Sequence, residues 1–97
     1  MSQIVENWAE IVGILLAILP APHRADFVEL HVRVEEVRRV DDWPLMLSGA
    51  EPDLAIMARR GQVDGCADAG GQRIRLRVRA EGPPPLTWFA HPGWRLD

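Results

Sequence analysis

One cysteine and three histidines are the side chains of this 97-residue chain best suited to nucleophilic, acid–base or metal chemistry. Cys66 lies between two aspartates and has no second cysteine at the spacing of a metal site. A cysteine nucleophile would need a histidine brought beside it by the fold. His23, His31 and His91 are scattered over the chain, and no spacing joins them to Cys66. We therefore predict no catalytic residue, no metal ligand and no cofactor, and we expect that the protein is not an enzyme.

Four arginines on one face of a predicted strand are the strongest indication of a binding surface. Residues 72–80 read Q-R-I-R-L-R-V-R-A, so arginine alternates strictly with an apolar residue. Successive side chains of a strand point to opposite faces, so the apolar set is expected in a core and the guanidinium groups on the other side. The predicted binding face, called the arginine face below, consists of Arg73, Arg75, Arg77 and Arg79.

Two interpretations of the arginine face stay open. If a strand over residues 28–34 lies beside it, Glu29 and Glu35 share the face, and opposite charges across a sheet contribute about 0.2–1 kcal/mol per pair. Alternatively, the guanidinium groups bind phosphates or an acidic partner protein, since arginine binds either anion in a bidentate manner. Nucleic-acid binding also calls for aromatic side chains that stack on bases, and none lies between Arg73 and Arg79. This favours a protein partner over nucleic acid.

The composition limits the class of protein further. A net charge of −3 and a pI near 5.5 count against a general nucleic-acid binder. All 11 basic residues are arginine, which excludes Schiff-base chemistry and a phosphate-loop lysine. The length and a hydrophobic fraction of 47% indicate one globular domain over residues 1–97. The single cysteine cannot form an internal disulfide, which favours a cytoplasmic location.

The N-terminal segment 1–20 is predicted to form a helix, over residues 3–19. Residues 11–19 are an unbroken apolar run, I-V-G-I-L-L-A-I-L, whereas a membrane-spanning helix needs roughly 20 such residues. No basic residue precedes the run, as a secretory signal would require, so we expect no membrane span. The second half of this helix would be apolar nearly all round. It must be covered by the domain's own core, by a second copy or by a partner protein.

The C-terminal aromatic residues, like the apolar N-terminal segment, belong either to the domain's own core or to an interface. Trp88, Phe89 and Trp94 either dock on the domain and close its core, or anchor an interface, where aromatic side chains often dominate the binding energy. The predicted interface residues are Ile11, Ile14, Leu15, Leu16, Ile18, Leu19, Trp88 and Trp94.

Residues 27–97 are predicted to be a body rich in strands. Apolar and polar residues alternate over residues 28–34, and the alternation breaks at Glu36, which indicates a β-bulge or a sharp bend. The other predicted elements are a hairpin over residues 43–58, of which 54–60 could instead be helical, a loop over 61–71, the arginine strand, and a last short strand over 86–90.

This order of elements resembles the OB-fold, a small Greek-key barrel of five strands. The resemblance covers residues 27–94 and is carried by the bent first strand and by G-Q-R-I-R-L-R-V-R-A-E ahead of a last short strand, without a family-specific motif. The predicted fold class is α+β, with the N-terminal helix packed on a small curved antiparallel sheet or an OB-like five-stranded barrel.

The predicted function is that of a small non-catalytic protein-interaction module or subunit. It would bind a protein partner, or form a homo-oligomer, through the apolar helix, the arginine face, or both. The alternative is an OB-like protein that binds single-stranded nucleic acid with the arginine strand.

Overall fold

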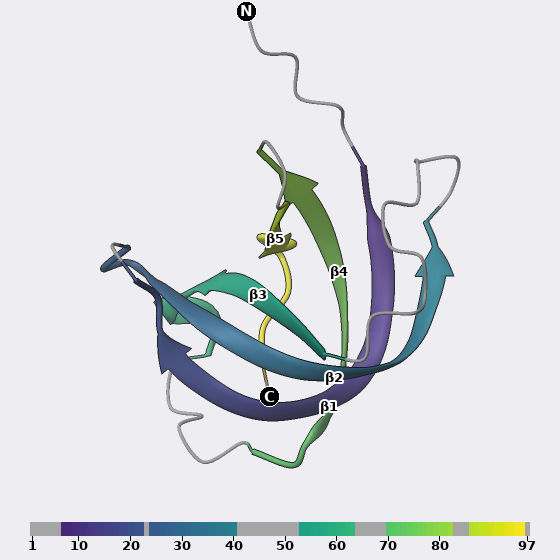
Figure 1. Ribbon diagram of the computed structural model, residues 1–97, viewed down its shortest axis with the longest axis horizontal. Coiled ribbons are helices and arrows are strands. Elements are labelled where there is room, and N and C mark those ends of the chain that lie inside the picture. Colours follow the sequence, from purple (N-terminus) through teal and green to yellow (C-terminus); the bar gives the residue numbers. More distant parts are fainter. Residues whose placement is uncertain (1–6, 23, 41–52, 64–69, 83–85, 97) are drawn as a thin grey trace, which may run out of the picture.

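The computed structural model describes residues 7–22, 24–40, 53–63, 70–82 and 86–96. These stretches form five strands and one short 3-10 turn (Figure 1). The elements are β1 (Ala9–Pro20), β2 (Phe27–Arg39), β3 (Asp53–Arg59), the turn η1 (Arg60–Gln62), β4 (Arg73–Glu81) and β5 (Thr87–Ala90).

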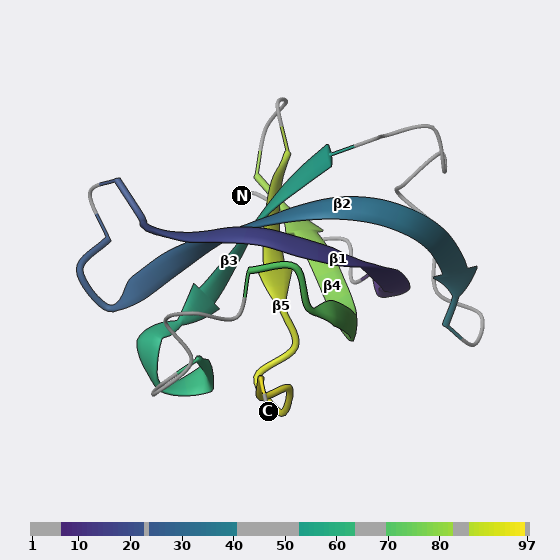
Figure 2. The ribbon, with the colours of Figure 1, turned by 90° about the horizontal axis from the view of Figure 1, so that it is seen from below.

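The five strands close into a barrel in the order β1–β2–β3–β5–β4, and β4 pairs back onto β1. Neighbouring strands are antiparallel except β3 and β5, which are parallel. In Figure 1, β1 and β2 are long curved ribbons that lie side by side. Figure 2 shows both of them crossing the direction of β4 and β5. The barrel alternative of the predicted fold class, which the OB-fold resemblance implied, therefore fits.

The predicted N-terminal helix, and with it the α+β class, is wrong, because the apolar run forms strand β1. A continuous apolar run does not distinguish a buried strand from a buried helix by its periodicity. The composition of the run favours the strand: Ile11, Val12, Ile14 and Ile18 are β-branched, and Gly13 weakens a helix interior. No helix among the described residues is long and apolar enough to cross a lipid bilayer.

Strand β1 is apolar because it has partners on both edges and a core on its inner face. It pairs with β2 along its whole length, and its residues 9–14 pair with β4 as well. Ile11 and Leu15 point into the barrel and are fully buried. The largest fully buried side chains come from four strands and are Ile11, Leu15, Leu30, Val32, Ile56 and Val78.

The break in alternation near Glu36 is confirmed as a β-bulge. Val12 lies opposite Glu36 and Gly13 lies opposite Val34, so Glu35 is an extra residue on β2. Bulges of this kind bend a strand and increase its twist. The bulge therefore gives β2 the curvature that Figure 1 shows, and it places Glu35 on the exposed outside of the barrel.

The predicted arginine strand is confirmed as β4. Its side chains alternate between the outside and the core, as the sequence pattern requires. Ile74, Leu76, Val78 and Ala80 are buried, whereas Arg73, Arg75 and Arg77 are exposed and Arg79 is half-buried.

The open alternative at residues 54–60 is resolved in favour of a strand. β3 occupies residues 54–59 of this stretch, and Arg60 begins η1, which continues into the predicted loop. The predicted last strand is confirmed as β5. The first arm of the predicted hairpin and most of the turn after it, residues 43–52, lie outside the described residues, as do residues 64–69 of the predicted loop.

Replacing Gly13 with alanine is expected to destabilise the barrel. A Cβ atom there would collide with the carbonyl oxygen of Arg33 and lie 2.8 Å from Cγ1 of Val32, so β1 and β2 would have to move apart. Overpacking of this kind costs typically about 1–3 kcal/mol, measured as the free energy of unfolding in urea. Gly61→Ala is the matched control, because a Cβ there meets no atom within 4 Å. Equal stability of the two variants would contradict the close approach of β1 to β2.

Candidate functional site

The arginine face is largely paired with carboxylates. The pairs are Arg73 Nε with Glu35 Oε1 at 3.3 Å, Arg75 Nε with Glu10 Oε1 at 3.3 Å, and Arg79 Nη2 with Glu81 Oε1. The side chains of Arg73 and Arg75 are 68% and 61% exposed, and exposed pairs contribute only about 0–1 kcal/mol each. Arg77 forms no ion pair with a residue in the described part of the chain.

Of the two glutamates predicted to share the arginine face, Glu35 does and Glu29 does not. Strand β1 lies between β2 and β4, so the two strands are not neighbours. The bulge brings Glu35 within reach of Arg73 across β1. Glu29 instead lies 2.6 Å from Nε2 of His31. Glu10, on β1 itself, supplies the second carboxylate.

A further carboxylate stays ionised beside the arginine face. The hydrogen bond that Arg38 Nε donates to Glu36 Oε1, 2.8 Å long, lowers the pKa of Glu36. The positive charges of Arg38, Arg75 and Arg73 lower this pKa as well. Because Glu36 is paired with Arg38, the charges of Arg73 and Arg75 on β4 are matched by Glu35 and Glu10 instead.

The residues predicted as an interface are spread over the inside and the outside of the barrel. Inside are Ile11, Leu15 and Trp88; half-buried are Ile14, Ile18 and Trp94; exposed are Leu16 and Leu19. Leu16 is an extra residue on β1, because Leu15 lies opposite Val32 and Ala17 opposite His31. Leu16 and Leu19, at 41% and 43% exposure, are the two members that present a large apolar side chain to the outside.

Aromatic and arginine side chains lie together on a second part of the outer surface, distinct from the arginine face, over four strands. Arg79 of β4 lies opposite Phe89 of β5, which lies opposite Met57 of β3, so these three half-buried side chains share one face. Phe27 of β2 and Arg59 of β3 form the adjacent pair. We define the aromatic–arginine surface as Trp8, Arg24, Phe27, Met57, Arg59, Arg79 and Phe89.

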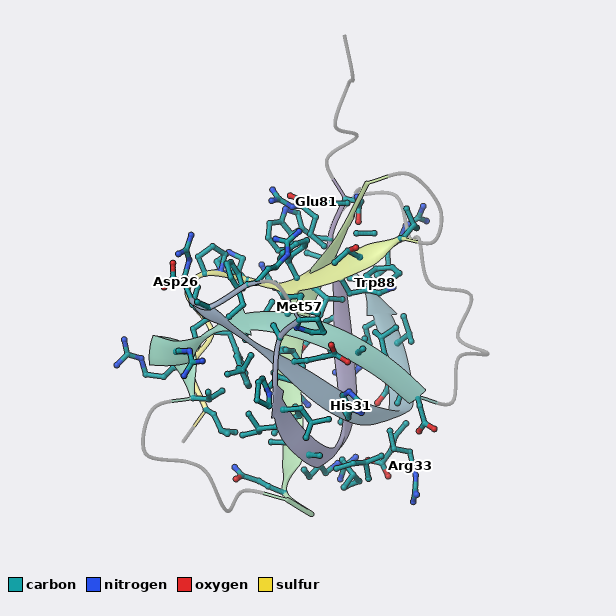
Figure 3. All side chains as sticks on the ribbon, turned by 60° about the vertical axis from the view of Figure 1, so that its left-hand side comes forward. Asp26, His31, Arg33, Met57, Glu81 and Trp88 are labelled. Carbon is teal, nitrogen blue, oxygen red and sulfur yellow. The ribbon has the colours of Figure 1, made fainter. Side chains whose placement is uncertain are left out.

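Figure 3 shows how this surface lies on the barrel. Met57 is central in the view, with Glu81 above it and Asp26 to its left. His31 and Arg33 lie at the lower side, farther along β2. The aromatic–arginine surface therefore occupies the end of the barrel at which β2 begins and β3 and β4 end.

Guanidinium groups cover the ring faces of this surface. Arg24 Cζ lies 5.9 Å from the ring centroid of Phe27 and 5.4 Å from that of Phe89, while Arg59 Cζ lies 5.2 Å from the centroid of Phe27. The two phenyl rings meet edge to face at 6.1 Å. Such cation–π contacts contribute about 0.5–1 kcal/mol at exposed sites. They hold two positive charges in place, and neither arginine forms an ion pair within the described stretches.

Asn7 fixes the tryptophan at the edge of the surface. Its Oδ1 accepts a hydrogen bond from the backbone N–H of Ala80 at 2.9 Å, and its Nδ2 donates to the carbonyl oxygen of Ala80 at 3.0 Å. Through its side chain, this buried amide extends the contact between β1 and β4 two residues beyond the last backbone pair, Ala9 with Val78. It holds Trp8 beside Arg79, whose Cζ lies 5.5 Å from the ring centroid of Trp8.

A cavity of about 330 Å³ opens between these side chains. Its lining is completed by Gln62, Glu81, Ala90 and Pro92. Three arginines and one glutamate line it, so the lining carries a net positive charge. A volume in this range matches the smaller ligand pockets, of about 300–1,000 Å³. The arrangement is suited to a planar, anionic ligand that stacks on rings and guanidinium planes.

Gln62 holds the wall of the cavity together. Its Nε2 donates hydrogen bonds to the carbonyl oxygens of His91 and Trp94, at 2.9 and 2.7 Å, and its Oε1 accepts one from the backbone N–H of Arg59 at 2.9 Å. The backbone N–H of Leu96 donates to the carbonyl oxygen of Gln62 at 2.8 Å. This residue therefore ties η1 to the segment that follows β5.

Sequence reasoning did not find the aromatic–arginine surface, although a signal for it exists. Phe27 precedes the buried Val28 in an alternating strand, and Phe89 lies between the buried Trp88 and Ala90. An aromatic residue in the outward phase of a strand indicates a surface role. Which two such residues meet depends on the strand order, which the sequence does not give.

The residues with catalytic or metal-binding chemistry do not come together. Cys66 and His23 lie outside the described residues. His31 bonds Glu29, whereas the ring of His91 packs against Trp8 at a centroid distance of 4.9 Å. Among the described residues, no group of three histidine, cysteine, aspartate or glutamate side chains is placed to hold a metal ion.

Comparison with known proteins gives no relative from which to infer function. The chain matches no protein-family model, no curated protein and no solved structure. The function is therefore argued from the geometry of the barrel and its surfaces.

Replacing Gln62 with leucine is expected to lower stability and to loosen the segment after β5. The variant leaves the carbonyl oxygens of His91 and Trp94 and the N–H of Arg59 without their partner. Losing partners for buried polar groups costs about 1–3 kcal/mol each, so we expect a loss of about 2 kcal/mol or more. Urea unfolding measures the loss, and amide hydrogen exchange at Leu96 should become faster. A variant as stable as the natural chain would contradict this role.

Proposed function

We propose that this protein binds single-stranded nucleic acid through the aromatic–arginine surface. The observation that carries the proposal is the stacking of Arg24 over two half-buried phenyl rings, Phe27 and Phe89, beside a positively lined cavity. Base stacking on aromatic side chains contributes about 1–3 kcal/mol per base, and guanidinium groups bind phosphates. The combination of rings and arginines that the arginine face lacks is present on this surface.

A single strand suits the surface better than a duplex. Ring and guanidinium faces can stack on a base only where that base is not already stacked between its neighbours. The exposed guanidinium groups of Arg24 and Arg59 lie over the phenyl rings, and their outer faces are available for a base to stack on. Arg24 and Arg59 are exposed and can turn toward phosphates while their stems keep packing on the rings.

The position of the surface on the barrel supports the same function by analogy of fold. OB-folds bind oligonucleotides on the face of their second and third strands and with the loops that join strands one to two and four to five. Phe27, Met57 and Arg59 belong to β2 and β3, and Arg24 lies in the connection from β1 to β2. Analogy of fold supports a function only together with the chemistry of the site, which here points the same way.

The protein-interaction hypothesis has lost its first support, because the apolar run is a barrel strand and not an uncovered helix. One specific observation still favours it as a second candidate: Leu16 and Leu19 are exposed on β1. Under either function the protein is proposed to be non-catalytic and to act in the cytoplasm, as its single cysteine favours.

Charge reversal at the surface provides the test. The double variant Arg24→Glu/Arg59→Glu is expected to bind a fluorescein-labelled oligothymidine at least tenfold more weakly, which corresponds to about 1.4 kcal/mol. The expected cause is the loss of phosphate contacts, so the slope of the logarithm of affinity against the logarithm of salt concentration should also become shallower, by about 0.7 per contact. Fluorescence anisotropy over a salt series measures both quantities.

Arg33→Glu/Arg73→Glu is the matched control, with the same change in charge. Both arginines are exposed and lie opposite Ile14, one on each side of β1, away from the aromatic–arginine surface. We expect this control to lose less than threefold. Absence of binding by the natural chain at tens of micromolar protein in low salt would overturn the proposed function. A larger loss in this control than in Arg24→Glu/Arg59→Glu would move the binding site to the region of Arg33 and Arg73. An equal loss would show that only the overall charge matters, and either result would overturn the proposed site.

A further inference from the structure

We infer that a second subsite for the same ligand lies on the other side of the Trp8–His91 pair, between β4 and the segment after β5, with Arg77 as its anchor. The inference rests on the proposed function and extends it: the bound single strand crosses from the aromatic–arginine surface, past Trp8 and His91, onto Arg77 and Trp94. The ligand is therefore longer than one that fills the first cavity alone.

The second subsite is a separate cavity with walls held in place by hydrogen bonds. Its volume is about 360 Å³, and it is lined by Glu10, Arg75, Leu76, Arg77, His91, Gly93 and Trp94. The backbone N–H of His91 donates to the carbonyl oxygen of Arg77 at 2.9 Å, and that of Trp94 donates to the carbonyl oxygen of His91 at 3.0 Å. The ring of His91 accepts a further hydrogen bond at Nδ1 from the N–H of Gly93, at 2.9 Å. The segment after β5 is thereby fixed along the edge of β4.

The charges in this cavity leave Arg77 available for an anion. Glu10 lines the cavity but pairs with Arg75, whose Nε lies 3.3 Å away. Arg77 is exposed and forms no ion pair with a residue in the described part of the chain. Of the arginines on β4, it is the one whose guanidinium is not matched by a carboxylate there. Phosphate is the anion that the proposed ligand presents at regular intervals along its length.

Trp8 and His91 connect the two cavities. Trp8 lines the first cavity and His91 lines the second, and their rings lie 4.9 Å apart at an angle of 51°. Arg79 and Arg77, one in each cavity, are successive outward residues of β4 and are therefore about 6.8 Å apart along the strand. A single strand that passes over the Trp8–His91 pair therefore contacts Arg79 in the first cavity and Arg77 in the second.

If the second subsite binds the ligand, replacing Arg77 should weaken the binding of a long ligand and leave the binding of a short one unchanged. The experiment compares thymidine 5′-monophosphate with an oligothymidine of about 12 nucleotides, within the span of about 4–16 nucleotides that one OB-fold covers. Arg77→Glu is expected to weaken binding of the longer ligand about tenfold and to leave that of the mononucleotide within twofold of the natural chain. Arg73→Glu, with the same change on the same strand, is the control and should change neither.

A spectroscopic signal reports the subsite without a charge change. The indole N–H resonance of Trp94, identified by its loss in Trp94→Phe, should shift when the longer oligomer is added and stay in place with the mononucleotide. If Trp94→Phe fails to fold, the Arg77→Glu comparison still decides.

The outcomes separate this inference from the function on which it rests. Binding by the natural chain that Arg24→Glu/Arg59→Glu weakens and Arg77→Glu does not would keep the proposed function and overturn the second subsite. An equal loss of both ligand lengths in Arg77→Glu would also overturn it, since Arg77 would then act only through the overall charge. No binding of either ligand by the natural chain would overturn both.

Discussion

Strand β1 pairs with β2 along its whole length and with β4 over residues 9–14, and the rest of the structure depends on this double pairing. The two ladders share one strand, so β1 must curve from one side of the barrel to the other. Gly13 permits the curve, because no side chain stands between β1 and the carbonyl group of Arg33, and the neighbouring bulge at Glu35 lets β2 follow. Without this contact the barrel would not close between β2 and β4, and β4 would keep only its pairing with β5.

Closure of the barrel creates the aromatic–arginine surface from residues that are far apart in the chain. The ladders from β2 to β3, from β3 to β5 and from β5 to β4 bring Phe27, Phe89 and Arg79 onto one outer face. Side chains from the chain before β1 and between β1 and β2 then complete it. The cavity on this surface is lined by three arginines and one glutamate although the protein carries a net charge of −3, and Glu35 and Glu10 pair with Arg73 and Arg75 elsewhere on the barrel. Overall charge therefore says little about the ligand of this protein.

The sequence predicts those features that depend on one strand alone. The alternation from Arg73 to Ala80 gives β4 and its outward arginines, and the broken alternation at Glu36 gives the bulge. The same kind of reasoning fails for residues 11–19, because an apolar run without a period fits a buried helix as well as a strand with partners on both edges. Reasoning from the alternation within one strand also does not predict contacts between strands. Phe27 and Phe89 meet only because β5 lies between β3 and β4.

The most direct test of the account is an NMR titration of the isotope-labelled protein with an unlabelled oligothymidine, because it locates the ligand on the barrel without any substitution. The account predicts that the largest amide shifts occur at Arg24, Phe27, Arg59 and Phe89, while Arg33 and Arg73 stay nearly unchanged. Shifts centred on Arg73 and Arg75, on Leu16 and Leu19, or nowhere on the protein would contradict it.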